Sequence, residues 1–319
     1  MASVKNNNNK RFPGAEELDH IDLRNLEKTP ENYIASGAFG DVYSVKDKDG
    51  NENEEYAVKF IKKTVWTQAM RAMLGTRFFN LNSLDIDFRT EVDTLFELKR
   101  QAIGPDIVYA NYTRHYYVIE KMDTTLHSIL NETKFTPTHA LMFLALIDRY
   151  LICDYLHDDF HVNNIMWSDT LKDFRIIDWG IGLRIGEMKE PKKTWWLKDR
   201  IESIIDGGVF WICMVYIKDC MDTETDETEL AKWTLMSEKY SEWIKSWWIS
   251  NKEELKLEPK WVEEYDIFSD KFKRQKYVNQ TIKVIKSFRI KKSSSKVSSG
   301  RLRKKSSKKK SKKKKEKNN

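Results

Sequence analysis

Three polar side chains near the middle of the chain have the types and spacing needed to bind a metal ion and handle a phosphoryl group. Asp159 and Asn164 lie five residues apart in the run HDDFHVNN, which begins at His157, and Asp178 lies in the run IIDWG. Carboxylate and amide oxygens are the hard ligands that Mg2+ prefers. Asp178 stands between two large apolar residues, where an unused charge would be costly. We therefore expect Asn164 and Asp178 to meet at a metal site, with Asp159 placed to meet an acceptor hydroxyl. Acids at the ends of surface loops are the alternative explanation at this point.

A glycine-bearing turn and a strand lysine in the early part of the chain could hold phosphates. In the run ASGAFGDV, from Ala35 to Val42, small residues would let backbone N–H groups approach an anion closely. Lys59 ends the triplet AVK, whose alternation predicts a strand with Ala57 and Lys59 on one face. A lysine on a buried strand face is costly unless an anion meets it, and a triphosphate or a carboxylate would serve. Taken singly, the turn could be an ordinary hairpin and the lysine could lie at a sheet edge.

Apolar periodicity predicts the elements that must position these side chains. A helix is expected over residues 84–98, and mainly helices are expected from residue 137 onward. Strands are expected within 33–61, at 107–109, at 116–119, and in a hairpin over 165–177. The first of these regions includes a hairpin turn at Asp49-Gly50. We predict an α+β chain in two lobes, a small, mostly-β N-lobe with one key helix and a larger, mostly-α C-lobe.

The charge distribution divides the chain into an acidic body and a basic tail. The net charge of the 319 residues is +7, yet residues 286–319 hold 17 Lys or Arg and one acid, so the rest of the chain is net acidic. We predict a flexible leader over 1–29 that could include a short helix, a folded domain over 30–290 with lobes 30–122 and 123–290, and a disordered Lys/Ser-rich tail over 291–319. The tail could make non-specific, salt-sensitive contacts with a nucleic acid or an acidic partner.

Cysteine usage and hydropathy favour an intracellular protein. The three cysteines form no CxxC pair and lie among apolar residues, so we expect reduced thiols rather than a metal site. The first ten residues are polar and predict no signal peptide. The longest apolar run, 207–217, is too short to span a bilayer and suits a buried helix. We therefore predict a protein of the cytoplasm or nucleus without a membrane partner, and leave its oligomeric state open.

The ordered set of motifs resembles the protein-kinase superfamily over about residues 30–290. The resemblance implies a divergent Ser/Thr protein kinase that uses ATP and Mg2+ and moves the γ-phosphate to a hydroxyl group. It implies that Asp159 orients the acceptor hydroxyl and accepts its proton. It also implies that Asn164 and Asp178 bind the Mg2+ ion.

The resemblance further implies an ATP site built from the early motifs. Lys59 would hold the α- and β-phosphates and pair with Glu91, with Glu97 as the less favoured partner. The segment 34–42 would fold over the phosphates, and 119–122 would form the back of the adenine pocket and the hinge that binds adenine through its backbone. The implied ATP-binding residues are Ile34, Ala35, Ser36, Gly37, Ala38, Phe39, Gly40, Asp41, Val42, Ala57, Lys59, Glu91, Ile119, Glu120 and Met122.

Several positions depart from the family pattern. The first glycine of the turn is Ala35, and the Arg that usually precedes the catalytic acid is Asp158, which implies that control by a phosphorylated loop is absent. The usual Lys two residues after that acid is His161, which we assign to catalysis, and the usual Phe of the magnesium motif is Trp179. No Ala-Pro-Glu motif follows, so we expect a short, weakly regulated activation segment. The stretch 62–87 is longer than usual and could hold an added helix.

The acceptor stays open between a protein and a small molecule. The Asp-x-His-x-x-Asn run followed by Asp-Trp is similar to choline and aminoglycoside phosphotransferases, so His161 weakens the case for a protein substrate. The glycine-bearing turn and the AVK triplet favour protein kinases, and we favour a protein substrate. A pseudokinase that only binds partners is a third hypothesis, which the presence of Lys59, Asp159, Asn164 and Asp178 argues against. The layout with a Lys-Ser tail also resembles kinases of large DNA viruses, which would place the protein in a host cell or virion.

Overall fold

The computed structural model describes residues 9–13, 18, 21–23, 26–37, 40–47, 49–62, 84–157, 159–184, 200, 201, 204 and 209–249. These residues all belong to the first of two compact units, which spans Met1–Trp261. The predictions made for Ala38, Phe39, Asp158, the added helix within 62–87 and the tail 291–319 lie outside the described residues.

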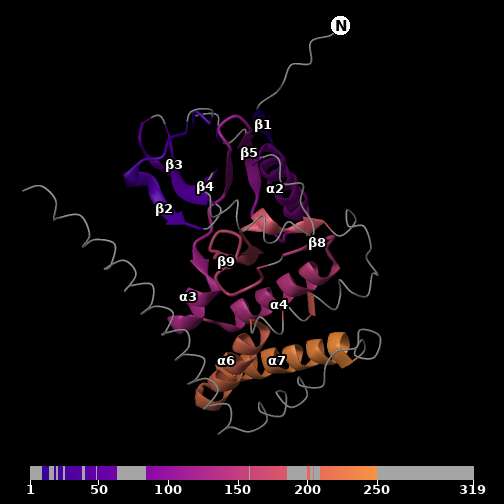
Figure 1. Cartoon of the computed structure of the whole chain (residues 1–319). Coiled ribbons are helices and arrows are strands. Elements are labelled where there is room, and N and C mark those ends of the chain that lie inside the picture. Colours follow the sequence, from indigo (N-terminus) through magenta and orange to yellow (C-terminus); the bar gives the residue numbers. More distant parts are fainter. Residues whose placement is uncertain are drawn as a thin grey trace, which may run out of the picture. The chain divides into compact units, whose positions relative to one another are not determined.

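An antiparallel sheet of six strands, in the order β1-β5-β6-β4-β3-β2, forms the first part of the fold (Figure 1). Its strands are β1 Asn9–Arg11, β2 Tyr33–Ser36, β3 Gly40–Lys46, β4 Glu52–Ile61, β5 Ile107–Asn111 and β6 Tyr116–Glu120. The turn between β3 and β4 places Gly50 at a φ of +86°, a conformation that glycine adopts without a steric penalty. The hairpin expected at Asp49-Gly50 and the later pair of strands are confirmed.

One face of this sheet is covered by the N-terminal segment. Strand β1 pairs with β5, and Leu18, Ile21 and Leu23 are at most 4% exposed in the same apolar cluster as Val58 and Phe60 of β4. Here the structure differs from the prediction of a flexible leader over 1–29. The apolar residues of this stretch follow no helical or strand period, so their role depends on the sheet that they cover, because an apolar sheet face must be buried against another element.

Helix α2, Leu84–Arg100, contacts the opposite face of the sheet. Its stripe of Phe88, Val92, Leu95 and Leu98 is at most 2% exposed, as the periodicity predicted. Because strand residues alternate between faces, Lys59 of β4 points away from the N-terminal segment and toward this helix. The alternation of side chains along β4 therefore directs Lys59 to the face of the sheet that α2 covers.

The rest of the described chain is mainly helical. The helices are α3 Leu126–Asn131, α4 Pro137–Ile152, α6 Val209–Thr223 and α7 Glu227–Ile244, followed by a π-helical turn over Lys245–Ile249. Two small sheets join β10 Asp173–Ile176, β9 Ile165–Ser168 and β7 Thr124–Thr125, and β11 Leu183–Arg184 with β8 Tyr155–Leu156. A capping box of Thr136 and His139 starts α4, which satisfies backbone N–H groups that the helix leaves unpaired.

The α+β prediction is confirmed at the level of its elements. The hairpin expected over 165–177 is β9–β10, and the apolar run 207–217 forms most of the buried helix α6. The three cysteines are free thiols. Within the described ranges, no helix is both long and apolar enough to cross a membrane.

Candidate functional site

Lys59, Glu91 and Asp178 form a buried charge cluster where β4, α2 and the segment after β10 meet. The Lys59 Nζ atom lies 3.0 Å from Oε1 of Glu91 and 2.8 Å from Oδ1 of Asp178. The side chains of Lys59 and Glu91 are 9% and 3% exposed. Two carboxylates therefore explain how a lysine is tolerated at this depth. The alternative partner, Glu97, pairs instead with Arg100 on an exposed part of α2.

The charges of the cluster hold each other in their ionised forms. Burial alone would lower the pKa of Lys59, but the carboxylates of Asp178 and Glu91 outweigh it and hold this pKa well above its ordinary value. Burial alone would raise the pKa of Asp178, but the Lys59 ammonium outweighs it and leaves that pKa below its ordinary value. Lys59 is therefore cationic and Asp178 anionic at neutral pH.

Tyr117 is a member of this cluster that sequence reasoning missed. It faces Lys59 across the β4–β6 pairing, and its hydroxyl donates a hydrogen bond of 2.8 Å to Oε1 of Glu91. Burial, followed by the charge of Glu91, raises the pKa of Tyr117 well above its ordinary value, so the hydroxyl keeps its proton. Its ring stacks on Phe88 of α2. Only the strand register could have revealed it, because the pairing of β4 with β6 is what sets Tyr117 opposite Lys59.

The loop between β8 and β9 brings Asp159, His161 and Asn164 together. The Asn164 Nδ2 atom donates to the backbone oxygen of Asp159 at 2.9 Å and to its Oδ2 at 3.2 Å. The His161 Nε2 atom lies 3.3 Å from the same Oδ2. The hydrogen bond from His161 is the main reason that the pKa of Asp159 lies below its ordinary value. Asp159 is therefore an oriented carboxylate, ionised at neutral pH.

His157 ties this loop to the segment that carries Asp178. Its Nε2 atom lies 2.8 Å from the carbonyl oxygen of Ile177, and its Nδ1 accepts a hydrogen bond of 3.3 Å from the backbone N–H of Asp159. Both contacts suit a neutral imidazole with its proton on Nε2, and burial lowers the pKa of His157. Ile177 in turn donates to the carbonyl oxygen of Asn164 at 2.8 Å. These bonds set Asn164 beside Asp178, although the sequence assigned His157 no role.

Trp179 holds Asp178 in its orientation. Asp178 has a φ of 65°, a left-handed conformation that a non-glycine residue keeps only where its surroundings impose it. The Trp179 ring is 1% exposed, and its Nε1 donates a hydrogen bond of 2.7 Å to the carbonyl oxygen of Ile176. The ring also makes edge contacts with Tyr150 and His157. The large indole in place of the expected Phe thus locks the turn that presents Asp178 to Lys59.

The glycine-bearing turn lies against the charge cluster. A Cβ atom on Gly37 would lie 3.8 Å from Oδ2 of Asp178. A Cβ atom on Gly40 would lie 2.8 Å from a backbone oxygen of β4 and 3.0 Å from Cε of Lys59, so this close approach requires glycine. The Gly37 N–H donates to the carbonyl oxygen of Gly40 at 2.8 Å. The turn therefore covers the lysine and the aspartate that the sequence assigned to phosphates and Mg2+.

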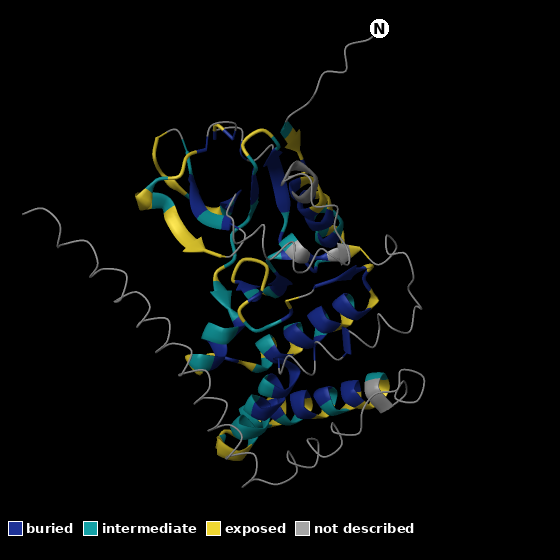
Figure 2. Ribbon diagram, viewed as in Figure 1, coloured by how far each residue is buried: buried dark blue, intermediate teal, exposed yellow. Residues whose placement is uncertain are grey.

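The apolar residues predicted to bind ATP lie on neighbouring strands. Ala57 is buried and pairs with Ile119 across β4 and β6, while Val42 pairs with Lys59 across β3 and β4. Ile34 is 45% exposed on β2, a strand that is exposed along its whole length and is yellow in Figure 2.

The backbone at 120–122, which was predicted to be a hinge, is held by two hydrogen bonds. The N–H groups of Glu120 and Lys121 donate at 2.7 Å to the carbonyl oxygens of Asp106 and Glu55. The backbone of Met122 makes none of the hydrogen bonds found between described residues in this stretch. Glu120 is half-buried, and this burial raises the pKa of its carboxyl group.

The donor set fits Mg2+ and a polyphosphate. Lys59 contacts two carboxylates, those of Glu91 and Asp178, and the charge of Asp159 acts on Asp178 as well, so a divalent cation would balance the negative charge around Asp178. Asn164 donates through Nδ2, which leaves its Oδ1 as a hard ligand, and its carbonyl oxygen accepts from Ile177, the residue before Asp178. In the described part of the chain, no three His, Cys, Asp or Glu side chains gather in a way that could hold a metal. The further ligands of Mg2+ would therefore come from phosphates and water, as is common for this ion.

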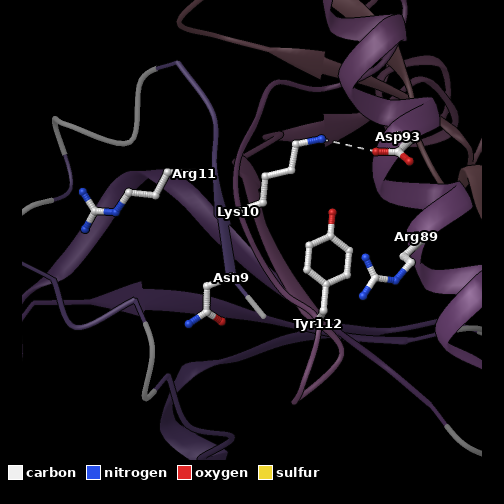
Figure 3. Close-up of a pocket in the computed structure, with 6 residues that line it drawn as sticks. All are labelled: Asn9, Lys10, Arg11, Arg89, Asp93 and Tyr112. Carbon is white, nitrogen blue, oxygen red and sulfur yellow. Dashed lines mark hydrogen bonds and ion pairs between the residues drawn. The ribbon is translucent and has the colours of Figure 1, made fainter. Parts of the chain in front are cut away.

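A separate hollow of about 470 Å³ lies between β1, α2 and the residue that follows β5 (Figure 3). Lys10 reaches across it to Asp93, with a distance of 3.4 Å between Nζ and Oδ1. The Arg89 guanidinium lies 4.4 Å from the ring centre of Tyr112. The predicted site residues are absent from its lining, so it is distinct from the charge cluster.

The structure brings together predicted residues in two groups, which are Lys59, Glu91 and Asp178, and Asp159 and Asn164. Ile34 lies on an exposed strand, and Glu97 lies apart from the charge cluster. The residues that sequence reasoning missed are Tyr117, His157 and Lys62, the last of which contacts the glycine-bearing turn.

The sequence matches no known protein-family model, and no curated protein matches it. The case for a function therefore depends on the contacts described above.

Proposed function

We propose that the chain is an ATP- and Mg2+-dependent phosphotransferase with a two-lobed, protein-kinase-like fold that phosphorylates Ser or Thr side chains of proteins. The observation that carries the proposal is the double contact of Lys59 with Glu91 and Asp178, which are 32 and 119 residues away in the sequence. A purely structural ion pair would not need the oriented loop of Asp159 and Asn164 beside it. The combination supports a site that handles a polyphosphate and a metal.

In this proposal the charge cluster binds and positions the nucleotide. Lys59 contacts oxygens of the α- and β-phosphates, and Glu91 and Tyr117 hold its ammonium in place. Backbone N–H groups of the glycine-bearing turn cover the phosphates. Asn164 and Asp178 would hold Mg2+, which neutralises charge on the phosphoryl oxygens when bound. Positioning and charge neutralisation are the main requirements for this reaction.

Asp159 serves the acceptor hydroxyl. The acceptor oxygen forms a bond to the γ-phosphorus while the bond between that phosphorus and the β–γ bridging oxygen breaks, and ADP leaves with the electron pair. The hydroxyl proton passes to a carboxylate oxygen of Asp159, whose lowered pKa keeps it ready to accept a hydrogen bond. His161 and Asn164 fix its orientation. Orientation rather than strong basicity is what a loose phosphoryl-transfer transition state needs.

A small-molecule hydroxyl is the second candidate acceptor. The observation that favours it is His161, which lies 3.3 Å from Asp159 and is 39% exposed at its side chain. An imidazole next to the acceptor carboxylate gives less attraction for an anionic transition state than the permanent charge of a lysine would. The same assay can separate the two acceptors.

Transfer of labelled γ-phosphate with Mg2+ tests the proposal. The reactions contain a basic protein, an acidic protein, choline, an aminoglycoside or the enzyme alone, each with wild type, Asp178→Ala and Asp169→Ala. Asp169 is a matched control because it is an exposed aspartate in the β9–β10 turn, with 66% of its side chain exposed. Label on protein that is lost only in Asp178→Ala is expected. Label on a small molecule would favour the second candidate, and ATP binding without transfer would favour a pseudokinase. Absence of ATP binding by the wild type would refute the proposal.

A further inference from the structure

Lys62 contacts both arms of the glycine-bearing turn. It directly follows β4, and its Nζ lies 2.6 Å from Oδ1 of Asp41 on β3 and 3.1 Å from the carbonyl oxygen of Gly37. The same ammonium donates to the hydroxyl of Ser36 at the end of β2. One cation therefore joins the strand that enters the turn, the turn itself and the strand that leaves it.

The turn that Lys62 joins is the one that covers the charge cluster. A Cβ atom on Gly37 would come within 3.8 Å of Asp178, and a Cβ atom on Gly40 would come within 3.0 Å of Lys59. Without Lys62, Gly37 would remain tied to the end of β4 only through its hydrogen bond to Gly40, which pairs with Ile61. Lys62 adds a direct tie from the residue after β4 to Gly37.

Lys62 also compensates the negative charge of Asp41. The side chains of Asp41 and Lys62 are 19% and 23% exposed, so their charges are only partly screened by water. Burial alone would raise the pKa of Asp41, but hydrogen bonds from Lys62 and Ser36 outweigh it and leave this pKa below its ordinary value. A negative charge on a turn that must cover phosphates would repel them, and Lys62 compensates it.

We propose that Lys62 is a positioning residue that holds the glycine-bearing turn closed over the phosphates of ATP and neutralises Asp41. The phosphate part of this inference depends on the proposed function, whereas the closure of the turn does not. Lys62 acts through the turn and needs no contact with the nucleotide. The ion pair therefore affects nucleotide affinity more than the chemical step.

The test compares Lys62→Met, Asp41→Asn, the double variant and Lys62→Arg with the wild type. Lys232→Met is the control, because Lys232 and Glu229 on α7 have the same separation of 2.6 Å between nitrogen and oxygen. Hydrogen–deuterium exchange of peptides covering 33–44 reports the turn without nucleotide. Calorimetry with Mg2+-ATP, together with KM and kcat, reports the phosphate site.

Lys62→Met should speed hydrogen–deuterium exchange in the turn. It should also raise the Kd and KM for ATP about tenfold, because one charge-assisted contact is lost. The change in kcat should be much smaller. The double variant should bind ATP more tightly than Lys62→Met, because it also removes the uncompensated charge of Asp41. Lys62→Arg should keep most of the affinity. Unchanged exchange in Lys62→Met would overturn the closure. Equal affinity of Lys62→Met and the double variant would overturn the charge argument. If Lys62→Met speeds exchange but the wild type binds no ATP, the closure stands and the phosphate role and the proposed function are refuted.

Discussion

Replacing Glu91 by Gln tests whether the buried charge cluster stabilises the protein as the geometry implies. The amide oxygen of Gln can accept the hydrogen bonds that Lys59 and Tyr117 now donate to Oε1 of Glu91, at 3.0 and 2.8 Å. The substitution removes the negative charge from both bonds: the ion pair with Lys59 becomes a hydrogen bond from a cation to a neutral oxygen, and the bond from Tyr117 becomes neutral. We take the loss as about 1 kcal/mol for each. Because Asp178 still pairs with Lys59, the lysine is not left as an unpaired buried charge. We expect the free energy of unfolding to fall by about 2 kcal/mol, less than the 3–5 kcal/mol typical of breaking a buried pair outright.

Glu97→Gln is the matched control for this substitution. Both glutamates lie on α2, but the Glu97 side chain is 42% exposed and its pair with Arg100 has a distance of 3.6 Å. Exposed pairs contribute little, so the control should lose less than about 0.5 kcal/mol. Urea denaturation followed by tryptophan fluorescence measures both variants. Equal losses in the two variants would refute the reasoning, because the difference in burial would then have no energetic consequence.

Further predictions concern the loop acid, the response to acid and the N-terminal segment. Asp159→Asn should lower kcat about 10²- to 10⁴-fold, the usual share of a positioned acid or base, with the Kd for ATP little changed in calorimetry. Asp178 has a pKa below its ordinary value in the folded protein, so its contribution to stability is present above the unfolded pKa of about 3.9 and is lost as the pH falls through the folded pKa. Asp178→Asn should therefore weaken the loss of stability in acid, as measured by urea midpoints of the metal-free protein at several pH values. Leu18→Ala should lower the free energy of unfolding by about 2–4 kcal/mol because Leu18 is 1% exposed in the core under the sheet. A loss as small as that of an exposed leucine, such as Leu235→Ala, would contradict the packing of the N-terminal segment.

Local patterns were sufficient wherever the relevant interactions lie close in sequence. The stripe on α2 was predicted because residues three and four apart share one helix face, and Phe88, Val92 and Leu95 are indeed buried. The turn at Gly50 was predicted because few residues other than glycine adopt its conformation. The same reasoning failed for Leu18 and Ile21, since their burial depends on the sheet beside them.

The sequence by itself determined the chemical types at the candidate site and the strands and helices that carry them. The spacing of Asp159 and Asn164, and the apolar neighbours of Asp178, are sufficient to indicate hard oxygen ligands. Only the tertiary structure decided which charges meet. It pairs Lys59 with Glu91 rather than Glu97, and it adds Tyr117, His157 and Lys62 through strand register, loop closure and the end of β4. The physical reason is that hydrogen bonds and ion pairs act over a few ångströms in space, and residues far apart in the chain reach that distance only after the sheet, α2 and the loops have packed together.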